Sequence, residues 1–220
     1  MDLLLTETEA RVLGALIEKE ITTPEYYPLS LNALVNACNQ KSSREPVMNL
    51  SEKEVLASID TLKSKKLAWQ LTTAYGRVPK FEHNIQNVFL FSRQELAIVD
   101  ALLLRGAQTM GELRTRTERM YHFSSLDEIG QTLNGLIERE DGPFVIELPR
   151  QAGHKDSRFM HLFYGMPDLE KMAEVRRETS FLNAAPASDR VSVLEEEVKQ
   201  VRIELDELKQ AFYDLKKQLE

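Results

Sequence analysis

The sequence is short of cysteine and of uninterrupted apolar runs, and each shortage excludes a class of protein. Cys38 is the one cysteine among 220 residues, so a single chain cannot build a disulfide framework or a thiolate-rich metal site. No apolar run approaches the roughly 18 residues of a membrane-spanning helix, and the first residues lack the basic stretch of a signal peptide. We therefore expect a cytoplasmic protein that makes no contact with membranes.

Positive charge is also in deficit. The 28 Lys and Arg residues stand against 35 Asp and Glu residues, which gives a net charge of −7 at pH 7. This balance argues against indiscriminate binding to nucleic acid or anionic lipid, although it leaves room for a local basic patch. With 42% apolar and 29% charged residues, the composition is that of a folded globular protein.

The sequence lacks the arrangements of residues that signal catalysis. The four histidines, His83, His122, His154 and His161, occur without an H-E-x-x-H pattern or a neighbouring cysteine that would indicate a metal site. There is no G-x-S-x-G elbow and no glycine-rich phosphate loop. We expect a protein that is not an enzyme and that carries neither a cofactor nor a metal.

An internal repeat organises the sequence. Residues 6–19 align with residues 92–105, and each copy opens an amphipathic helix with a capping box, in which Ser or Thr is followed three residues later by Glu. A second, shorter helix is predicted where residues 30–39 align with residues 109–119. A third helix closes each copy, again behind a capping box. The four predicted boxes are Thr6 with Glu9, Ser51 with Glu54, Ser92 with Glu95, and Ser125 with Glu128.

After each third helix the apolar period shifts from 3.6 toward 2, which indicates strands. The predicted strands cover residues 67–73 and begin again at Phe81 in the first copy; in the second copy they cover residues 144–148 and 159–164. Three helices followed by a β-hairpin is the order of elements in a winged helix-turn-helix. The predicted fold class is therefore mostly α with small β-hairpins, a tandem winged helix-turn-helix followed by a C-terminal coiled-coil helix.

The end of the sequence carries a heptad pattern. Apolar residues fill every a and d position of about four heptads, which is typical of a coiled coil. These candidate dimerisation residues are Val191, Leu194, Val198, Val201, Leu205, Leu208, Phe212, Leu215 and Leu219. In a parallel pair Glu197 would face Arg202 and Glu204 would face Lys209, so we predict a parallel homodimer. A helix that folds back onto the domains is the alternative.

These patterns divide the chain into segments. The predicted segments are a first winged-helix domain over 1–84, a connector over 85–91, a second winged-helix domain over 92–166, a helix over 167–182, a linker over 183–189 and the coiled coil over 190–220. The connector is apolar, which favours a third strand or packing between the domains over a loose linker.

Six stretches of the sequence have distinctive residue strings that occur in a distinctive order: residues 22–30, 36–41, 44–50, 103–114, 148–153 and 158–163. Together they resemble the YceH family of uncharacterised bacterial proteins, and the resemblance spans residues 3–165. It implies a tandem winged-helix fold, commonly followed by a coiled coil, and it brings no activity, ligand or catalytic residue. Phe81 stands where relatives often carry Tyr.

Positive charge gathers on the predicted wings, where DNA-binding winged helices contact phosphates. The candidate nucleic-acid or partner-binding residues are Lys63, Lys65, Lys66, Arg77 and Lys80 around the first hairpin, Arg150, Lys155 and Arg158 in the second, and Arg114, Arg116 and Arg119 on the second helix of the second copy. The predicted third helices carry acidic residues such as Glu52 and Asp127, which repel phosphates. Two functions therefore remain: a dimeric DNA-binding, transcription-regulator-like protein, or a protein-protein interaction module that holds a protein partner.

Two smaller features also have two interpretations. Cys38 is predicted as a core residue of the second helix, with a redox sensor as the alternative. Residues 44–46 are predicted to form a turn, with a contact surface as the alternative.

Overall fold

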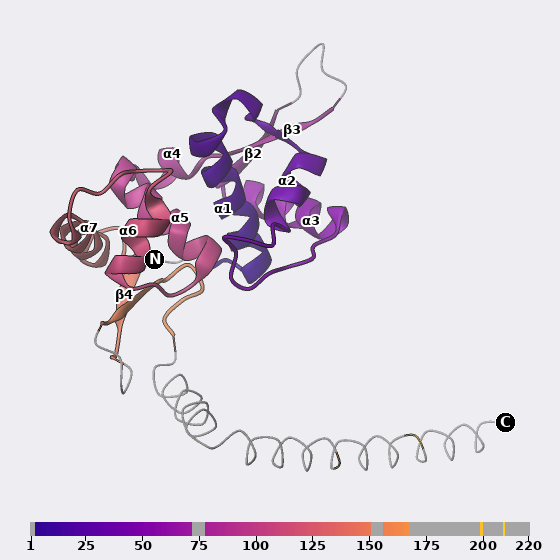
Figure 1. Cartoon of the computed structure of the whole chain (residues 1–220). Helices are drawn as coiled ribbons and strands as arrows, with labels where there is room; N and C mark the ends of the chain where they lie inside the picture. The colour runs from indigo at the N-terminus through magenta and orange to yellow at the C-terminus, as the bar shows by residue number, and fades with distance from the viewer. Residues whose placement is uncertain (1–2, 72–77, 151–155, 168–198, 200–208, 210–220) are drawn as a thin grey trace. The chain divides into compact units, whose positions relative to one another are not determined.

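The computed structural model describes residues 3–71, 78–150 and 156–167, together with Lys199 and Lys209. Residues Met1–Pro167 form one unit and Asp168–Glu220 a second. In the first unit, two sets of three helices lie beside one another, and antiparallel strands follow each set (Figure 1). The mostly helical class with small antiparallel strand pairs is thus confirmed.

The first helix set is followed by a small sheet. The helices are α1 (Glu7–Thr22), α2 (Leu31–Cys38) and α3 (Glu52–Ser64), with a 3₁₀ turn, η1 (Pro24–Tyr26), after α1. The strands are β1 (Leu29–Ser30), β2 (Ala68–Leu71) and β3 (Lys80–His83). They are antiparallel in the order β1-β3-β2, so the short β1 segment before α2 is the third strand of this sheet.

The second helix set repeats the arrangement with two strands. Its elements are α5 (Arg93–Arg105), α6 (Met110–Thr117), α7 (Leu126–Glu138), β4 (Val145–Leu148) and β5 (Arg158–His161). In the register of this antiparallel pair, Val145 lies opposite His161 and Leu148 opposite Arg158. Leu34 on α2 and Leu113 on α6, which the repeat aligns, are both fully buried.

Three of the four predicted capping boxes are present, at the starts of α1, α3 and α5. The fourth predicted box, Ser125 with Glu128, forms only one of its two hydrogen bonds. The Ser125 hydroxyl does accept from the Glu128 backbone N–H, but the Glu128 carboxylate accepts from Ser124 N–H at 2.9 Å and from the Tyr121 hydroxyl at 2.9 Å. Two nearby donors therefore draw this carboxylate away from the reciprocal bond.

The connector contains a helix, α4 (Ile85–Phe89), so the expectation of a third strand there is wrong. The helix ends where Leu90 adopts a left-handed conformation, with φ at 51°. The connector instead packs against the second set. The rings of Phe89 and Phe91 contact the Phe144 ring edge-to-face, with centroids 5.0 and 4.9 Å away.

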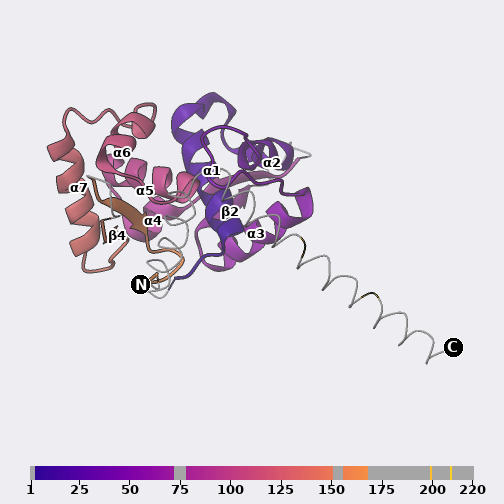
Figure 2. The same ribbon diagram turned by 60° about the horizontal axis from the view of Figure 1, so that its bottom comes forward.

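Helices α1 and α5 pack against one another and join the two sets (Figures 1 and 2). A Cβ atom at Gly14 would lie 2.9 Å from the Leu104 side chain, so glycine is what permits this close approach. Most of the buried apolar residues form one cluster that includes residues of both helices. The Leu5 N–H also donates to the Phe163 carbonyl at 2.7 Å. This hydrogen bond joins the residues just before α1 to the residues just after β5.

No helix within the described ranges is long and apolar enough to cross a membrane. Most of the predicted C-terminal segments, the helix over 167–182, the linker over 183–189 and the coiled coil over 190–220, lie outside the described residues. So do all nine candidate dimerisation residues, from Val191 to Leu219. Lys199 and Lys209 are helical and exposed.

Candidate functional site

The predicted cations around the first sheet have different surroundings. The Lys65 ammonium donates to the Glu9 carboxylate at 2.7 Å and to the Leu4 carbonyl at 2.8 Å. Lys63 pairs with Asp60 at 3.2 Å on the surface of α3. Lys66 and Lys80 are exposed and make no ion pair with the described residues, and Arg77 lies outside those residues.

In the second set, two predicted cations share one carboxylate. Arg158 and Arg116 approach Glu112 at 3.1 and 3.4 Å, and Arg158 also donates to the Ala107 carbonyl at 2.8 Å. Arg114 donates to the Ser124 carbonyl at 3.3 Å, and Arg150 to the Ser157 hydroxyl at 3.3 Å.

Arg119 and Lys155 are the two remaining predicted cations of the second copy. Arg119 is exposed and forms no ion pair with the described residues, and Lys155 lies outside them. Of the predicted phosphate contacts, Lys65, Arg116 and Arg158 are thus already held by carboxylates.

Glu112 is the residue that organises this cluster, and the sequence analysis missed it. It forms a capping box with Thr109 at the start of α6. Burial alone would raise the pKa of Glu112, but the Thr109 N–H and the charges of Arg158 and Arg116 bring it below its usual value. The spacing of Thr109 and Glu112 is the same signal that located the other boxes, so it was available in the sequence.

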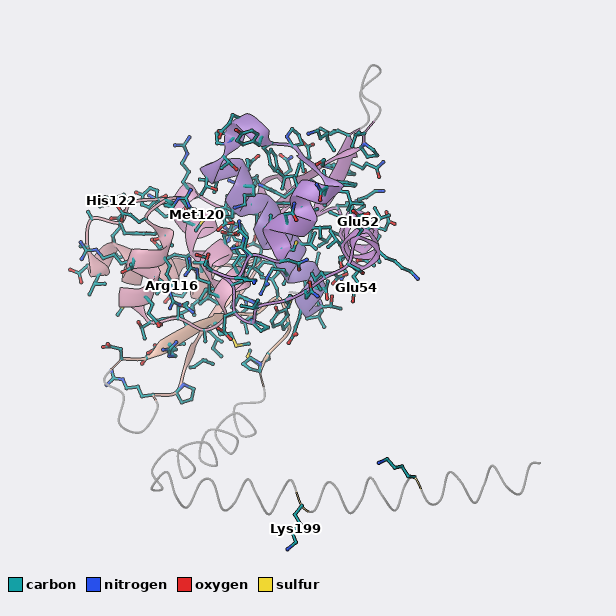
Figure 3. The ribbon with its side chains drawn as sticks, turned by 45° about the vertical axis from the view of Figure 1, so that its right-hand side comes forward. Glu52, Glu54, Arg116, Met120, His122 and Lys199 are labelled. Atoms are coloured by element: carbon teal, nitrogen blue, oxygen red, sulfur yellow. The ribbon has the colours of Figure 1, made fainter. Side chains whose placement is uncertain are left out.

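The third helices offer little to a phosphate-lined groove. The surface of α3 carries Glu52, Glu54 and Asp60 against Lys53 and Lys63, and Figure 3 shows Glu52 and Glu54 at the outer edge of the first set. The exposed residues of α7 include Asp127 and Glu138 and no Lys or Arg. Carboxylates on such faces repel phosphate.

The first sheet presents a mixed apolar and charged outer face. In the antiparallel register Trp69 lies opposite Glu82 and Leu71 opposite Lys80, and paired residues project from the same side of a sheet. Phe81 and His83 project from the other side and are buried. We call Trp69, Leu71, Lys80 and Glu82 the outer sheet face. Trp69 is the one tryptophan of the sequence, and it is 43% exposed.

The three histidines that the structure describes, His83, His122 and His161, belong to no cluster of potential metal ligands. Within the described ranges there is no cluster of three His, Cys, Asp or Glu residues suited to a metal ion. His83 Nε2 contacts Glu20 at 2.7 Å and His122 Nδ1 contacts Glu118 at 2.6 Å. Burial lowers the pKa of His161 to about 4, and His154 lies outside the described residues.

The loop after α2 is held from inside by two buried arginines, which the sequence analysis did not foresee. The Arg44 guanidinium forms a bidentate pair with Glu18 at 3.2 and 2.6 Å and donates to the Ala37 carbonyl. Arg11 donates to the carbonyls of Cys38 and Pro46 at 3.1 and 2.6 Å. Arg44 is therefore a structural anchor of the turn rather than a surface contact.

Cys38 is fully buried, as predicted for a core residue. Burial raises the pKa of its thiol to about 12, and the nearby Arg44 and Arg11 offset only part of that effect. Because the thiolate is the reactive form, this environment disfavours a redox-sensing role.

Comparison with known proteins gives a consistent result. The model of a family described as "Protein of unknown function, DUF480" matches residues 5–154. A UPF0502 protein of Photobacterium profundum is 46% identical over 220 residues, covering 98% of this chain and 99% of the relative. A UPF0502 protein of Geobacter sulfurreducens is 52% identical over 201 residues, covering 90% of each chain. None of these descriptions assigns an activity.

Proposed function

Because this chain belongs to that family, DUF480, whose description names no activity, we propose its function from its own geometry. Membership confirms the resemblance drawn from the sequence to a family of uncharacterised bacterial proteins. The protein is a non-enzymatic tandem winged-helix protein that holds a protein partner on the outer sheet face of its first set.

The winged-helix assignment is supported by the order and pairing of the elements. Each set places three helices before an antiparallel strand pair, and in the first set a short strand before α2 pairs with β3. A helix-turn-helix followed by such a sheet is the arrangement that defines a winged helix. The strand pairs β2–β3 and β4–β5 are the two wings.

The observation that carries the proposal is the exposure of Trp69 on the first wing. A tryptophan buries a large apolar area when it is covered, and tryptophan is enriched among the residues that dominate the energy of protein interfaces. Leu71 adds apolar area beside it on the edge strand β2, and Lys80 and Glu82 supply charge of both signs on the adjacent central strand β3. Exposed apolar side chains next to polar ones are the composition of a protein interface.

DNA binding by a transcription-regulator-like protein is the second candidate, and the exposed Lys66, Lys80 and Arg150 favour it. These side chains are able to contact phosphates. However, Lys65, Arg116 and Arg158 are committed to carboxylates, and α7 presents acidic residues without exposed Lys or Arg. The electrostatic term that dominates DNA affinity is therefore weakened.

The test of the protein-interaction proposal is affinity capture from cell lysate with and without nuclease, using the wild type, Trp69→Ser and a matched control, Leu90→Ser. Leu90 is 78% exposed and lies outside the outer sheet face. Leu90→Ser therefore controls for non-specific binding through exposed apolar side chains. We expect a partner that survives nuclease on the wild type and on Leu90→Ser and is lost from Trp69→Ser. Loss of the partner with nuclease, or its retention by Trp69→Ser, contradicts the proposal.

The DNA candidate is tested by fluorescence anisotropy with a random-sequence duplex. Binding at ~50 mM salt that weakens steeply as salt rises supports it, with the salt slope falling by about one unit in Lys80→Gln. The control is Arg93→Gln, at an exposed arginine at the start of α5 that belongs to neither wing. Absence of binding at that salt concentration removes the candidate.

A further inference from the structure

A pocket of about 420 Å³ lies where the two helix sets meet. Its walls come from the loop after α2, the end of α5 with the residues that follow it, α6, and β5. The loop is bound to α5 directly, since the Glu45 N–H donates to the Leu104 carbonyl at 2.9 Å. Gly106 ends α5 with φ at 68°, a conformation that glycine adopts readily.

The pocket has a surplus of positive charge. Four arginines, Arg44, Arg105, Arg116 and Arg158, line it against two glutamates, Glu45 and Glu112. Because Arg44 is also paired with Glu18, the surplus is one positive charge. The chain as a whole has a net charge of −7, so this local sign is opposite to that of the molecule. Arginines that gather in a concave site typically bind phosphate or carboxylate groups.

Arg105 differs from the other three arginines of this cluster in its partners. Arg44 is paired with Glu18, and Arg116 and Arg158 share Glu112, whereas the Arg105 side chain makes no hydrogen bond or ion pair with the described residues. Burial lowers the pKa of Arg105, and the positive charge of Arg116 lowers it further. An anion in the pocket would relieve this repulsion.

Gln108 supplies a second, independent observation. It lines the pocket and is 2% exposed, and its side-chain N–H₂ donates to the carbonyls of Arg105 and Ala107 at 2.9 and 3.0 Å. Its Oε1 atom is buried and accepts no hydrogen bond from the described residues. Buried acceptors normally have a donor, so this oxygen is able to accept a hydrogen bond from a water molecule or from a ligand hydroxyl or N–H group.

We propose that this pocket binds a small metabolite that carries a phosphate group and a neighbouring hydroxyl or N–H. Arg105, Arg116 and Arg158 contact the phosphate oxygens, and the hydroxyl or N–H donates to Gln108 Oε1. The pairs with Glu112 leave donors to spare, because each guanidinium has five N–H groups. A volume of about 420 Å³ exceeds that of a phosphate ion and lies within the range of metabolite sites, ~300–1,000 Å³.

The site is independent of the outer sheet face, so the proposal stands or falls separately from the proposed function. A ligand there would contact both helix sets at once. It would therefore stabilise the folded first unit in proportion to its occupancy.

The test is thermal unfolding of the full chain in inorganic phosphate and in chloride at equal ionic strength. We expect phosphate to raise the Tm of the wild type by several degrees over chloride, and the concentration dependence gives its Kd. Arg105→Gln should weaken this Kd at least ~10-fold, since it removes one charge-assisted contact. Arg105→Lys, which keeps the charge, should lose less.

The matched control is Arg119→Gln, an exposed arginine that lies outside the pocket and forms no ion pair with the described residues. It should bind phosphate as the wild type does. Circular dichroism confirms that each variant is folded, which is expected for Arg105→Gln because no internal partner is lost. The proposal fails when phosphate stabilises the wild type no more than chloride, or when Arg105→Gln responds like the wild type.

A competition experiment identifies the source of the phosphate. Glycerol 3-phosphate, which has hydroxyls for Gln108, should bind more tightly than inorganic phosphate. A short DNA duplex should not displace glycerol 3-phosphate from the pocket. Displacement by the duplex assigns the pocket to nucleic-acid phosphates and overturns the metabolite proposal.

Discussion

The carboxyl group of Asp100 is fully buried on α5 near Gly14 of α1, and neither of its oxygens accepts a hydrogen bond from the described residues. Burial raises the pKa of Asp100 well above its usual value, and the negative charge of Glu18 adds to the effect. Arg44, Arg105 and Lys19 oppose the shift without cancelling it. A group in this position makes the stability of the first unit depend on pH.

The sign of that dependence follows from proton binding. Since the pKa of Asp100 is higher in the folded state than in the unfolded chain, the folded state holds the extra proton at pH values between the two. The free energy of unfolding therefore falls as pH rises above the unfolded pKa, near 3.9, toward the raised folded value. Asp100→Asn removes this loss and should be more stable than the wild type at pH 8, by about 1–3 kcal/mol, with the gain shrinking toward pH 4.

Urea unfolding at pH 4, 6 and 8 measures the difference. The control is Asp60→Asn, at an exposed residue that pairs with Lys63 on the surface of α3. Wild-type and Asp100→Asn stabilities that change in parallel with pH would show that Asp100 does not hold its proton in the folded state.

The Arg44–Glu18 pair is expected to contribute strongly to the stability of the loop after α2. Its N–O distances are 3.2 and 2.6 Å, and the Arg44 side chain is 0% exposed. Arg44→Met takes the bidentate partner from Glu18, which keeps only its pair with Lys19 at 3.0 Å, and leaves the Ala37 carbonyl without its donor. It should lower the free energy of unfolding by about 1–3 kcal/mol.

The surface variant Lys63→Met breaks an exposed pair of the same charge type, so it should cost no more than about 1 kcal/mol. The double variant Glu18→Gln with Arg44→Met should be more stable than Arg44→Met alone, because it also removes the Glu18 charge that has lost its bidentate partner. Urea unfolding measures all three. Equal losses in Arg44→Met and Lys63→Met would contradict the anchoring role.

At the scale of the elements, α6 combines a helix start with a charge cluster. Glu112 accepts the Thr109 N–H at 2.9 Å and also neutralises Arg116 and Arg158. Glu112→Gln keeps an oxygen for the cap and removes the charge that competes for both arginines. We therefore expect this variant to bind inorganic phosphate several-fold more tightly than the wild type, in the same thermal titration.

A matched control for α6 is Glu118→Gln, at the exposed C-terminal end of the same helix, where the carboxylate contacts His122. It changes the net charge equally and leaves the pocket intact, so its phosphate affinity should equal that of the wild type. Weaker phosphate binding by Glu112→Gln would show that Glu112 orients the arginines rather than competing with a ligand.

The helices were predictable because their signals are local. A Ser or Thr followed three residues later by Glu located the starts of α1, α3 and α5, and the apolar spacing supplied the buried faces. The connector was harder, because a short apolar run such as residues 85–91 fits a strand as well as a buried helix. The Glu128 carboxylate accepts a hydrogen bond from Tyr121 instead of completing the capping box. Competition between side chains of this kind leaves no periodic pattern in the sequence.

The candidate site was predictable only in its residue types. The sequence shows where Lys65 and Arg158 stand along the chain, but their carboxylate partners, Glu9 and Glu112, lie 56 and 46 residues away. The pocket was not foreseen at all. It exists because the loop after α2 and the end of α5 are joined across the two sets, by contacts that no sequence period encodes.

At the scale of the whole molecule, the proposed assembly depends on residues 190–220. If they form a parallel two-stranded coiled coil, two copies of the outer sheet face and of the pocket are presented together, which raises avidity for a repeated partner. Sedimentation equilibrium of the full chain should then give the mass of a dimer. Leu208→Asp places a charge at a d position and should give a monomer, whereas Gln210→Asp, at an outward f position, should leave the dimer intact.

The orientation of the pair is testable with a single added thiol. In a parallel coil the two Val191 positions lie at the same end and face one another, so Val191→Cys should form a covalent dimer on mild oxidation. In an antiparallel coil these positions lie at opposite ends and no such link forms. The native thiol does not interfere, because Cys38 is buried and its pKa is raised to about 12. A monomeric full chain, or a Leu208→Asp variant that remains dimeric, would instead favour a C-terminal helix that packs without pairing two molecules.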